Sequence, residues 1–286
     1  MKTSEIQIRD PFILVHNGKY YLYGSGRRNG REKCGFDVVT STDLENWSEP
    51  KTIFEQNDNF WADKDYWAPE VHEYEGKFYL FASFKSEKRH RGTQIMVCDT
   101  PDGRFEPITE FPVTPENWEC LDGTLFMEDG KPYIVFCHEW TQIGDGTICA
   151  MQLSDDLKEA VGEPFELIKA SELPNVKSLG AESGNYITDG PFFYRCTNGK
   201  LIMLWSSFKP VYGYIQTAAV SSDGTLKGKW THTHPDIYTN DGGHGMIFTD
   251  LNGELRLSLH SPNGGFEVAK FLHIKEEDGI ISIIDK

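Results

Sequence analysis

Five short segments of the chain share one pattern, and this repeat limits the fold more than any other feature. Each segment is an Asn-Gly, Asp-Gly or Glu-Gly pair followed by residues that favour β-strands. Such pairs favour tight hairpins, because both turn residues need positive φ. The turn glycines lie 58, 54, 69 and 54 residues apart, at Gly18, Gly76, Gly130, Gly199 and Gly253. A hairpin repeat of this length predicts an all-β fold: a five-bladed β-propeller with four antiparallel strands per blade.

The five units fill residues 1–286, so we expect a single propeller domain. In each unit one strand precedes the turn, a second follows it, and further strands complete the blade. The fifth unit has an apolar run of its own at 280–284, which we expect to form its outer strand. The N-terminus would then not pair with blade five. A β-sandwich is the alternative fold, but it would not need five matching registers.

The charge balance limits the partners of the protein. The chain has 28 Lys and Arg against 44 Asp and Glu, a formal net charge of −16. An acidic surface disfavours nucleic acid and anionic membranes. The first residues have no apolar leader segment, and six scattered cysteines indicate reduced thiols, so we expect a cytoplasmic location. The sequence carries no signal for an oligomeric state.

Polar residues recur near the start of the first strand in each unit. They lie 6 to 10 residues before the turn glycines, at Asp10, Glu70, Asp122, Asp189 and His244. Because the first strands of propeller blades line the central channel, we expect four carboxylates and one imidazole to meet at one face. A ring of carboxylates in a sheltered site is costly, since like charges raise each other's pKa. The pattern therefore indicates a functional site.

Two separated carboxylates on either side of a glycosidic bond can hydrolyse it. One activates a water molecule, and the other protonates the leaving oxygen. Opposed blades of a propeller leave room for that water, which predicts inversion of the anomeric configuration.

Four motifs resemble those of glycoside hydrolase family 43. In chain order they are Arg9-Asp10-Pro11-Phe12, Trp67-Ala68-Pro69-Glu70-Val71, Leu121-Asp122-Gly123-Thr124-Leu125-Phe126 and Asp189-Gly190-Pro191-Phe192. The resemblance covers essentially the whole chain. It implies a five-bladed propeller that hydrolyses α-L-arabinofuranosides or β-D-xylosides with inversion. It also implies that Asp10 is the general base, that Asp122 orients the general acid and tunes its pKa, and that the acid lies at position 189.

The fourth motif departs from the family pattern. The family has Glu before Gly-Pro, whereas this chain has Asp189. Aspartate is shorter by one methylene, about 1.5 Å of reach, and a proton donor must come within hydrogen-bonding distance of the leaving oxygen. Either the backbone lies closer to the substrate, or Glu182 in the preceding loop serves as the acid, or activity is weak or absent.

Other residues are expected to contact the substrate or an ion. Aromatic faces bind the C–H surface of sugars. The residues that we expect to bind substrate are Arg9, Phe36, Trp67, Glu70, Trp140 and His244. The family resemblance also implies that a channel histidine at the position of His244 helps to hold one Ca²⁺ ion. A purely substrate-facing or hydrogen-bonded histidine is the alternative.

The favoured function is hydrolysis of small arabinofuranosyl or xylosyl oligosaccharides. A non-catalytic carbohydrate-binding propeller is the alternative suggested by Asp189. A fructoside-cleaving relative is a third, because Glu119-Cys120 resembles the acid motif of that group. That group also has Asn before its first Asp-Pro, where this chain has Arg9.

Overall fold

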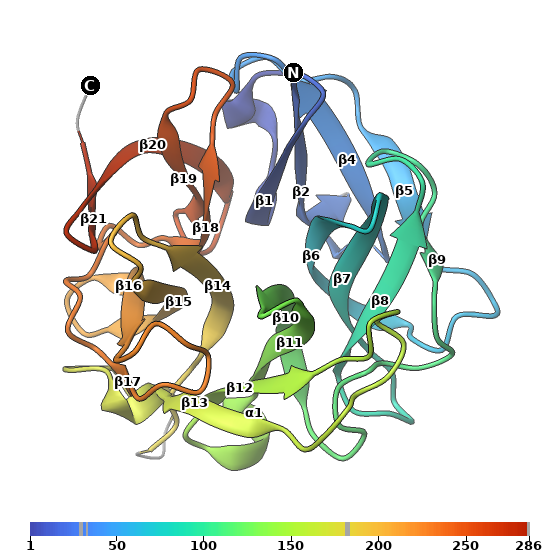
Figure 1. The fold of residues 1–286 in the computed structure, drawn as a ribbon. Coiled ribbons are helices and arrows are strands. Elements are labelled where there is room, and N and C mark those ends of the chain that lie inside the picture. Colours follow the sequence, from blue (N-terminus) through green and yellow to red (C-terminus); the bar gives the residue numbers. More distant parts are fainter. Residues whose placement is uncertain (29–30, 33, 181–183, 285–286) are drawn as a thin grey trace.

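A computed structural model describes residues 1–28, 31–32, 34–180 and 184–284 of the protein. Within these residues, the strands form five antiparallel sheets around a central axis, and the first strand of each sheet lies nearest that axis (Figure 1). The predicted five-bladed propeller is confirmed. The blades follow one another in chain order, so every polar residue at the start of a first strand is delivered toward the same channel.

The first three blades contain most of the short and irregular strands. Blade one contains β1 (Ile8–His16), β2 (Lys19–Arg28), β3 (Arg31–Glu32), β4 (Gly35–Ser41) and β5 (Lys51–Glu55). Blade two contains β6 (Lys64–Tyr74), β7 (Lys77–Lys85), β8 (Gly92–Cys98) and β9 (Glu106–Pro107). Blade three contains β10 (Cys120–Glu128), β11 (Lys131–His138), β12 (Thr147–Gln152) and β13 (Phe165–Lys169), with α1 (Trp140–Ile143) after β11. Two 3₁₀ turns, Thr3–Glu5 and Ala170–Glu172, complete the elements outside the last two blades.

The last two blades close the ring. Blade four contains β14 (Asp189–Arg195), β15 (Leu201–Lys209), β16 (Gly213–Ser221) and β17 (Trp230–Thr231). Blade five contains β18 (Gly243–Thr249), β19 (Leu255–Ser261), β20 (Val268–Glu277) and β21 (Ile280–Ile283). Because β21 pairs with β20, blade five has an outer strand of its own, as predicted. The N-terminal residues do not form this outer strand, and Lys2 forms a bridge with Asn46 of blade one.

The predicted turns form in two ways. In blades one to three both turn residues have positive φ, as at Asn17 (47°) and Gly18 (72°). In blades four and five only the glycine does, at Gly199 (86°) and Gly253 (82°). The hairpin positions were therefore predictable, although positive φ at both turn residues is found only in the first three blades.

Every first strand is interrupted by a bulge at the channel. The pairing with the second strand shifts at this point in all five blades. The residues with left-handed backbone here are Asp10 (φ 53°), Ala68 (46°), Asp122 (55°), Gly190 (55°) and His244 (53°). A bulge re-aims a side chain and often lies beside an active site. Residues other than glycine adopt this left-handed backbone conformation at a cost in free energy.

Apolar side chains fill the spaces between the blades. Trp205, Tyr23 and Phe36 are among the largest fully buried side chains. Each of the six cysteines is free, and four of them are buried. The packed core therefore fixes the positions of the five bulges.

Across the described ranges, no helix has the length and apolar character needed to cross a membrane.

Candidate active site

The five polar residues do not all occupy the same position relative to the bulge of their strand. Asp10, Asp122 and His244 occupy the left-handed bulge position itself, whereas blades two and four have Ala68 and Gly190 there. Glu70 lies two residues later, opposite Phe81 of β7. Asp189 lies one residue earlier, opposite Ser206 of β15. The single register that we predicted is therefore right for three residues and wrong for Glu70 and Asp189.

A repeated hydrogen bond joins each bulge to the preceding blade. In blades one, two, three and five, the backbone N–H of the bulge residue donates to a side chain on the second strand of the preceding blade. Ala68 donates to Ser25 Oγ (2.7 Å), Asp122 to Ser83 Oγ (2.9 Å), His244 to Ser206 Oγ (2.7 Å), and Asp10 to His260 Nδ1 (3.2 Å). These bonds satisfy buried donors that the bulge removes from the sheet. They also fix the bulges relative to one another around the ring.

The contact between blades three and four departs from this pattern. The equivalent acceptor would come from Cys137, which pairs with Leu121, and a thiol is a weak acceptor. The N–H of Gly190 instead donates to Oδ2 of Asp122, at 3.0 Å. The bulge that follows Asp189 is therefore held directly by the Asp122 carboxylate.

Asp10 is set up as an ionised carboxylate. Its Oδ2 accepts a hydrogen bond from Ser25 Oγ (2.5 Å), and its Oδ1 lies 3.1 Å from His244 Nδ1. Burial alone would raise the pKa of Asp10, but the charges of His244 and Arg9 outweigh burial and lower it to about 2. His260 contributes as the acceptor of the Asp10 N–H, and burial lowers its own pKa to about 4.

The pKa of Asp189 is shifted in the opposite direction from that of Asp10. Burial, followed by the charge of Asp122, raises its pKa to about 7. Its Oδ2 accepts a hydrogen bond from the hydroxyl of Tyr214 at 3.0 Å. The pKa of Asp122 is raised well above its usual value by burial and by Asp10. One pocket thus holds a carboxylate that stays ionised and a carboxyl that keeps its proton near neutrality, the pairing that acid–base catalysis needs.

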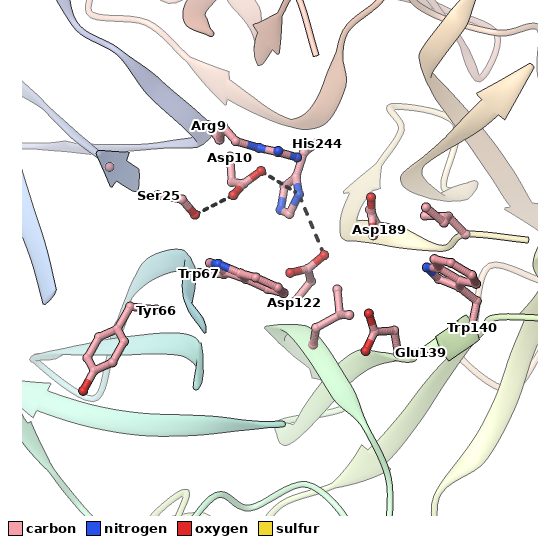
Figure 2. A pocket seen from close by; sticks show the side chains of 13 residues that line it. Arg9, Asp10, Ser25, Tyr66, Trp67, Asp122, Glu139, Trp140, Asp189 and His244 are labelled. Carbon is pink, nitrogen blue, oxygen red and sulfur yellow. Dashed lines mark hydrogen bonds and ion pairs between the residues drawn. The ribbon is translucent and has the colours of Figure 1, made fainter. Parts of the chain in front are cut away.

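These groups line a pocket of about 200 Å³ at the mouth of the channel. Figure 2 shows Asp10, His244 and Asp122 together, with Asp189 across from Asp10 and the indoles of Trp67 and Trp140 at the sides. The residues that line it are Arg9, Asp10, Ser25, Gly26, Tyr66, Trp67, Leu121, Asp122, Glu139, Trp140, Ile187, Asp189 and His244. Seven of the nine residues predicted for the site are in this set.

The other two predicted residues lie elsewhere. Phe36 is 1% exposed and packs against Phe54 and Phe84 in the core, so it is not a sugar platform. Glu70 lines a smaller cavity deeper in the channel and pairs with His72 Nε2 at 2.9 Å. Its place beyond the bulge explains why it misses the pocket.

The sequence offered two alternative acids, Glu182 and Glu119. Glu182 lies outside the described residues. Glu119, which suggested a fructoside-cleaving enzyme, does not line the pocket and is bound by Lys85 Nζ (2.9 Å) and His90 Nδ1 (2.8 Å). Burial would raise the pKa of Glu119, but these partners outweigh it and lower the pKa to about 2, which does not suit a proton donor.

Calcium at His244 stays a prediction. The ring Nδ1 of His244 faces Asp10 and, at 3.8 Å, Asp122. In the part of the chain that the structure describes, no group of three His, Cys, Asp or Glu side chains is arranged to hold a metal ion. No step proposed below depends on a metal.

Several residues of the site were not predicted. Ser25, Tyr214 and His260 reach it from second and third strands, and Glu139 from the end of β11. One signal was available: Asp10 and Asp122 lie 8 residues before their turn glycines and His244 lies 9, whereas Glu70 lies 6 and Asp189 lies 10. The outlying spacings mark the two residues that leave the common register.

Comparison with known proteins agrees with this arrangement. The model of glycosyl hydrolases family 43 matches residues 3–275. An endo-arabinase from Bacteroides thetaiotaomicron has a solved structure that is 41% identical, with 98% of each chain covered and a TM-score of 0.91. The extracellular endo-alpha-(1->5)-L-arabinanase 1 of Bacillus subtilis (strain 168) is 26% identical over 152 residues, 49% of this chain and 46% of that protein.

A further curated relative is the extracellular exo-alpha-(1->5)-L-arabinofuranosidase ArbA of Cellvibrio japonicus (strain Ueda107). It is 24% identical over 211 residues, 68% of this chain and 57% of that protein. The chain thus spans about half the length of the curated relatives that it matches. The family match extends over nearly the whole propeller, and it coincides with the bulges that carry Asp10, Asp122 and Asp189. The chain therefore belongs to glycosyl hydrolases family 43.

Proposed function

We propose that the protein is a glycoside hydrolase that cleaves α-L-arabinofuranosyl or β-D-xylosyl bonds of small oligosaccharides with inversion. The observation that carries this proposal is the contrast between two carboxyl groups of one pocket. Asp10 has a pKa lowered to about 2, and Asp189 has a pKa raised to about 7. Near neutral pH one can accept a proton while the other can donate one, and hydrolysis needs both.

The site supports the following sequence of steps. Asp10 takes a proton from a water molecule, which attacks the anomeric carbon. Asp189 gives its proton to the glycosidic oxygen as the bond to the leaving group breaks. Asp122 holds the Gly190 N–H and so positions the segment that carries the acid. His244 and Ser25 fix the orientation of the Asp10 carboxylate.

Arabinofuranosyl bonds are the first substrates to test. The relative with 41% identity over 98% of the chain is named an endo-arabinase, and two curated relatives are named for α-(1->5)-L-arabinan bonds. Another is named a xylosidase/arabinosidase, so xylosides are the second class. The direct test is release of sugar from α-1,5-linked arabino-oligosaccharides and β-1,4-linked xylo-oligosaccharides. Absence of hydrolysis with both would contradict the proposal.

A cytoplasmic location remains part of this proposal. Two of the curated relatives are named as extracellular enzymes. Fractionation of the source cells would decide between the two locations. A cytoplasmic enzyme would act on short imported oligosaccharides, whereas a secreted one would also meet polymers.

The pH dependence should report both catalytic groups. We expect kcat/KM to fall as pH rises through about 7, because Asp189 must be protonated to act as the acid. Since the pKa of Asp10 is about 2, the loss at the acid end should come only near that pH. Initial rates between pH 4 and 9 should therefore show one falling limb. A rising limb centred near 7 would contradict the assignment.

The stereochemistry of the product is a separate test. We expect inversion, because Asp10 activates water and does not attack the sugar. ¹H NMR spectra recorded in the first minutes of hydrolysis should show the anomer opposite to that of the substrate. Initial release of the same anomer would indicate a covalent intermediate and a nucleophilic role for a carboxylate.

A further inference from the structure

Glu139 is a buried acidic residue of the pocket that the mechanism above does not use. It follows β11 directly, precedes α1, and is 9% exposed. Figure 2 shows it between Asp122 and Trp140. One carboxylate oxygen, Oε2, pairs with Arg91 Nη1. The other, Oε1, has no partner among the residues that the structure describes, and it is not sealed from the pocket.

Arg91 connects Glu139 to the aromatic wall of the pocket. Its guanidinium carbon lies 4.4 Å from the ring centre of Trp67, and its Nη2 donates to Asp65 Oδ2 at 2.8 Å. The side chain of Arg91 is 7% exposed. A guanidinium over an indole is a favourable cation–π contact. Arg91 therefore holds Trp67 from blade two and Glu139 from blade three in fixed relation.

The charged side chains around Glu139 leave one of its carboxylate oxygens able to accept a hydrogen bond. Lys85 Nζ is 2.9 Å from both carboxylate oxygens of Glu119, so this pair is neutral. Arg91 then pairs with Asp65 and Glu139, and Glu119 Oε2 lies farther from its Nη1, at 3.9 Å. One positive charge faces two negative ones, and Glu139 keeps an unpaired oxygen at the pocket. Sugar hydroxyls can donate hydrogen bonds to such an unpaired carboxylate oxygen.

We propose that Glu139 binds a hydroxyl group of the sugar and that Arg91 is the positioning residue that fixes Glu139 and Trp67 around it. This inference rests on the proposed function and deepens it. Trp67 supplies the apolar face for one side of the ring, and Glu139 selects sugars with a hydroxyl group at the matching position. A sugar without that hydroxyl leaves a buried charge unsatisfied, which is the costly case.

Calorimetry on a variant that hydrolyses the sugar slowly provides the test. The probes are α-1,5-linked arabinotriose and β-1,4-linked xylotriose, titrated into Asp10→Asn protein with and without Glu139→Gln. We expect Glu139→Gln to raise Kd by about ten- to a hundredfold for the triose that binds, as for a hydrogen bond to a charged group. An unchanged Kd would overturn the inference. Asp250→Asn is the matched control, because Asp250 is a buried carboxylate paired with Arg256 Nε (2.9 Å) in blade five.

Monodeoxy probes separate sugar binding from a structural role. Against Asp10→Asn protein, one monodeoxy analogue of the preferred sugar should bind at least tenfold more weakly than the parent sugar. Glu139→Gln should remove that discrimination, and Asp250→Asn should keep it. If Glu139→Gln does not fold, the deoxy series alone decides: equal binding of every analogue overturns the inference.

The experiments distinguish failure of the proposed hydrolysis from failure of the proposed role of Glu139. Binding of a triose without hydrolysis by the unmodified protein would overturn the proposed reaction and leave the role of Glu139 standing. Hydrolysis with a Kd that Glu139→Gln does not change would overturn the role of Glu139 alone. Absence of any binding by either triose would overturn both.

Discussion

Asp10→Asn is expected to lower kcat on arabino- or xylo-oligosaccharides by about 10²–10⁴-fold, the usual contribution of a general base. Asparagine has nearly the same shape as aspartate, but it cannot take a proton from water. Ser25 and His260 contact this residue through a side-chain and a backbone bond, so the bulge should persist. Initial rates with saturating substrate measure the effect.

The control for Asp10→Asn is an equivalent change on the surface. Asp102 forms an exposed ion pair with Lys51 at 3.0 Å, and Asp102→Asn should keep full activity. Calorimetry should show that Asp10→Asn still binds the oligosaccharide. Unchanged turnover in Asp10→Asn would remove this residue from the mechanism.

Asp189→Asn is expected to abolish hydrolysis of unactivated oligosaccharides while partly sparing aryl glycosides. A p-nitrophenolate leaving group needs little protonation, whereas a sugar leaving group needs a proton donor. The expected loss is about 10²–10⁴-fold with oligosaccharides. The falling limb of the pH profile near 7 should disappear with aryl substrates. Equal losses with both substrate classes would argue that Asp189 does not act as the acid.

Asp189→Glu decides between a working enzyme and a binding protein. Tyr214 donates to Asp189 at 3.0 Å, and the Gly190 N–H is held by Asp122, so the site fits the shorter side chain. We expect the longer acid to lower activity. Strong activity created by Asp189→Glu from an inactive natural protein would show a carbohydrate-binding propeller that has lost its acid. If neither Asp189 variant changes a robust activity, Glu182 becomes the first alternative.

The sequence predicted the ring of blades better than its edges. Glycine-marked hairpins are local, so positions such as Gly18 and Gly130 could be read directly. The outer strands β9 and β17 contain two residues each and have no periodicity to detect. Their pairing depends on the neighbouring strand, which a local pattern does not reveal.

The sequence predicted the site residues best where a polar side chain occupies the bulge position itself. Asp10, Asp122 and His244 share the bulge position, and their similar spacing from the turns agrees with it. Asp189 and Glu70 carry the same chemistry one residue before and two residues after that position, and a shift along a bulged strand changes where a side chain points. Aromatic residues gave less information, because burial of Phe36 depends on the whole fold.

The hydrogen bonds between blades also determine when the site can exist during synthesis. Asp10 belongs to the first blade that leaves the ribosome, whereas His244 and His260, which hold its carboxylate and its N–H, belong to the last. A nascent chain with four blades contains Asp10, Asp122 and Asp189 but lacks the two histidines that contact the Asp10 carboxylate and accept its N–H. The base therefore matures only when blade five docks against blade one. Catalytic competence and closure of the ring become one event, and no shorter folding intermediate carries a complete site.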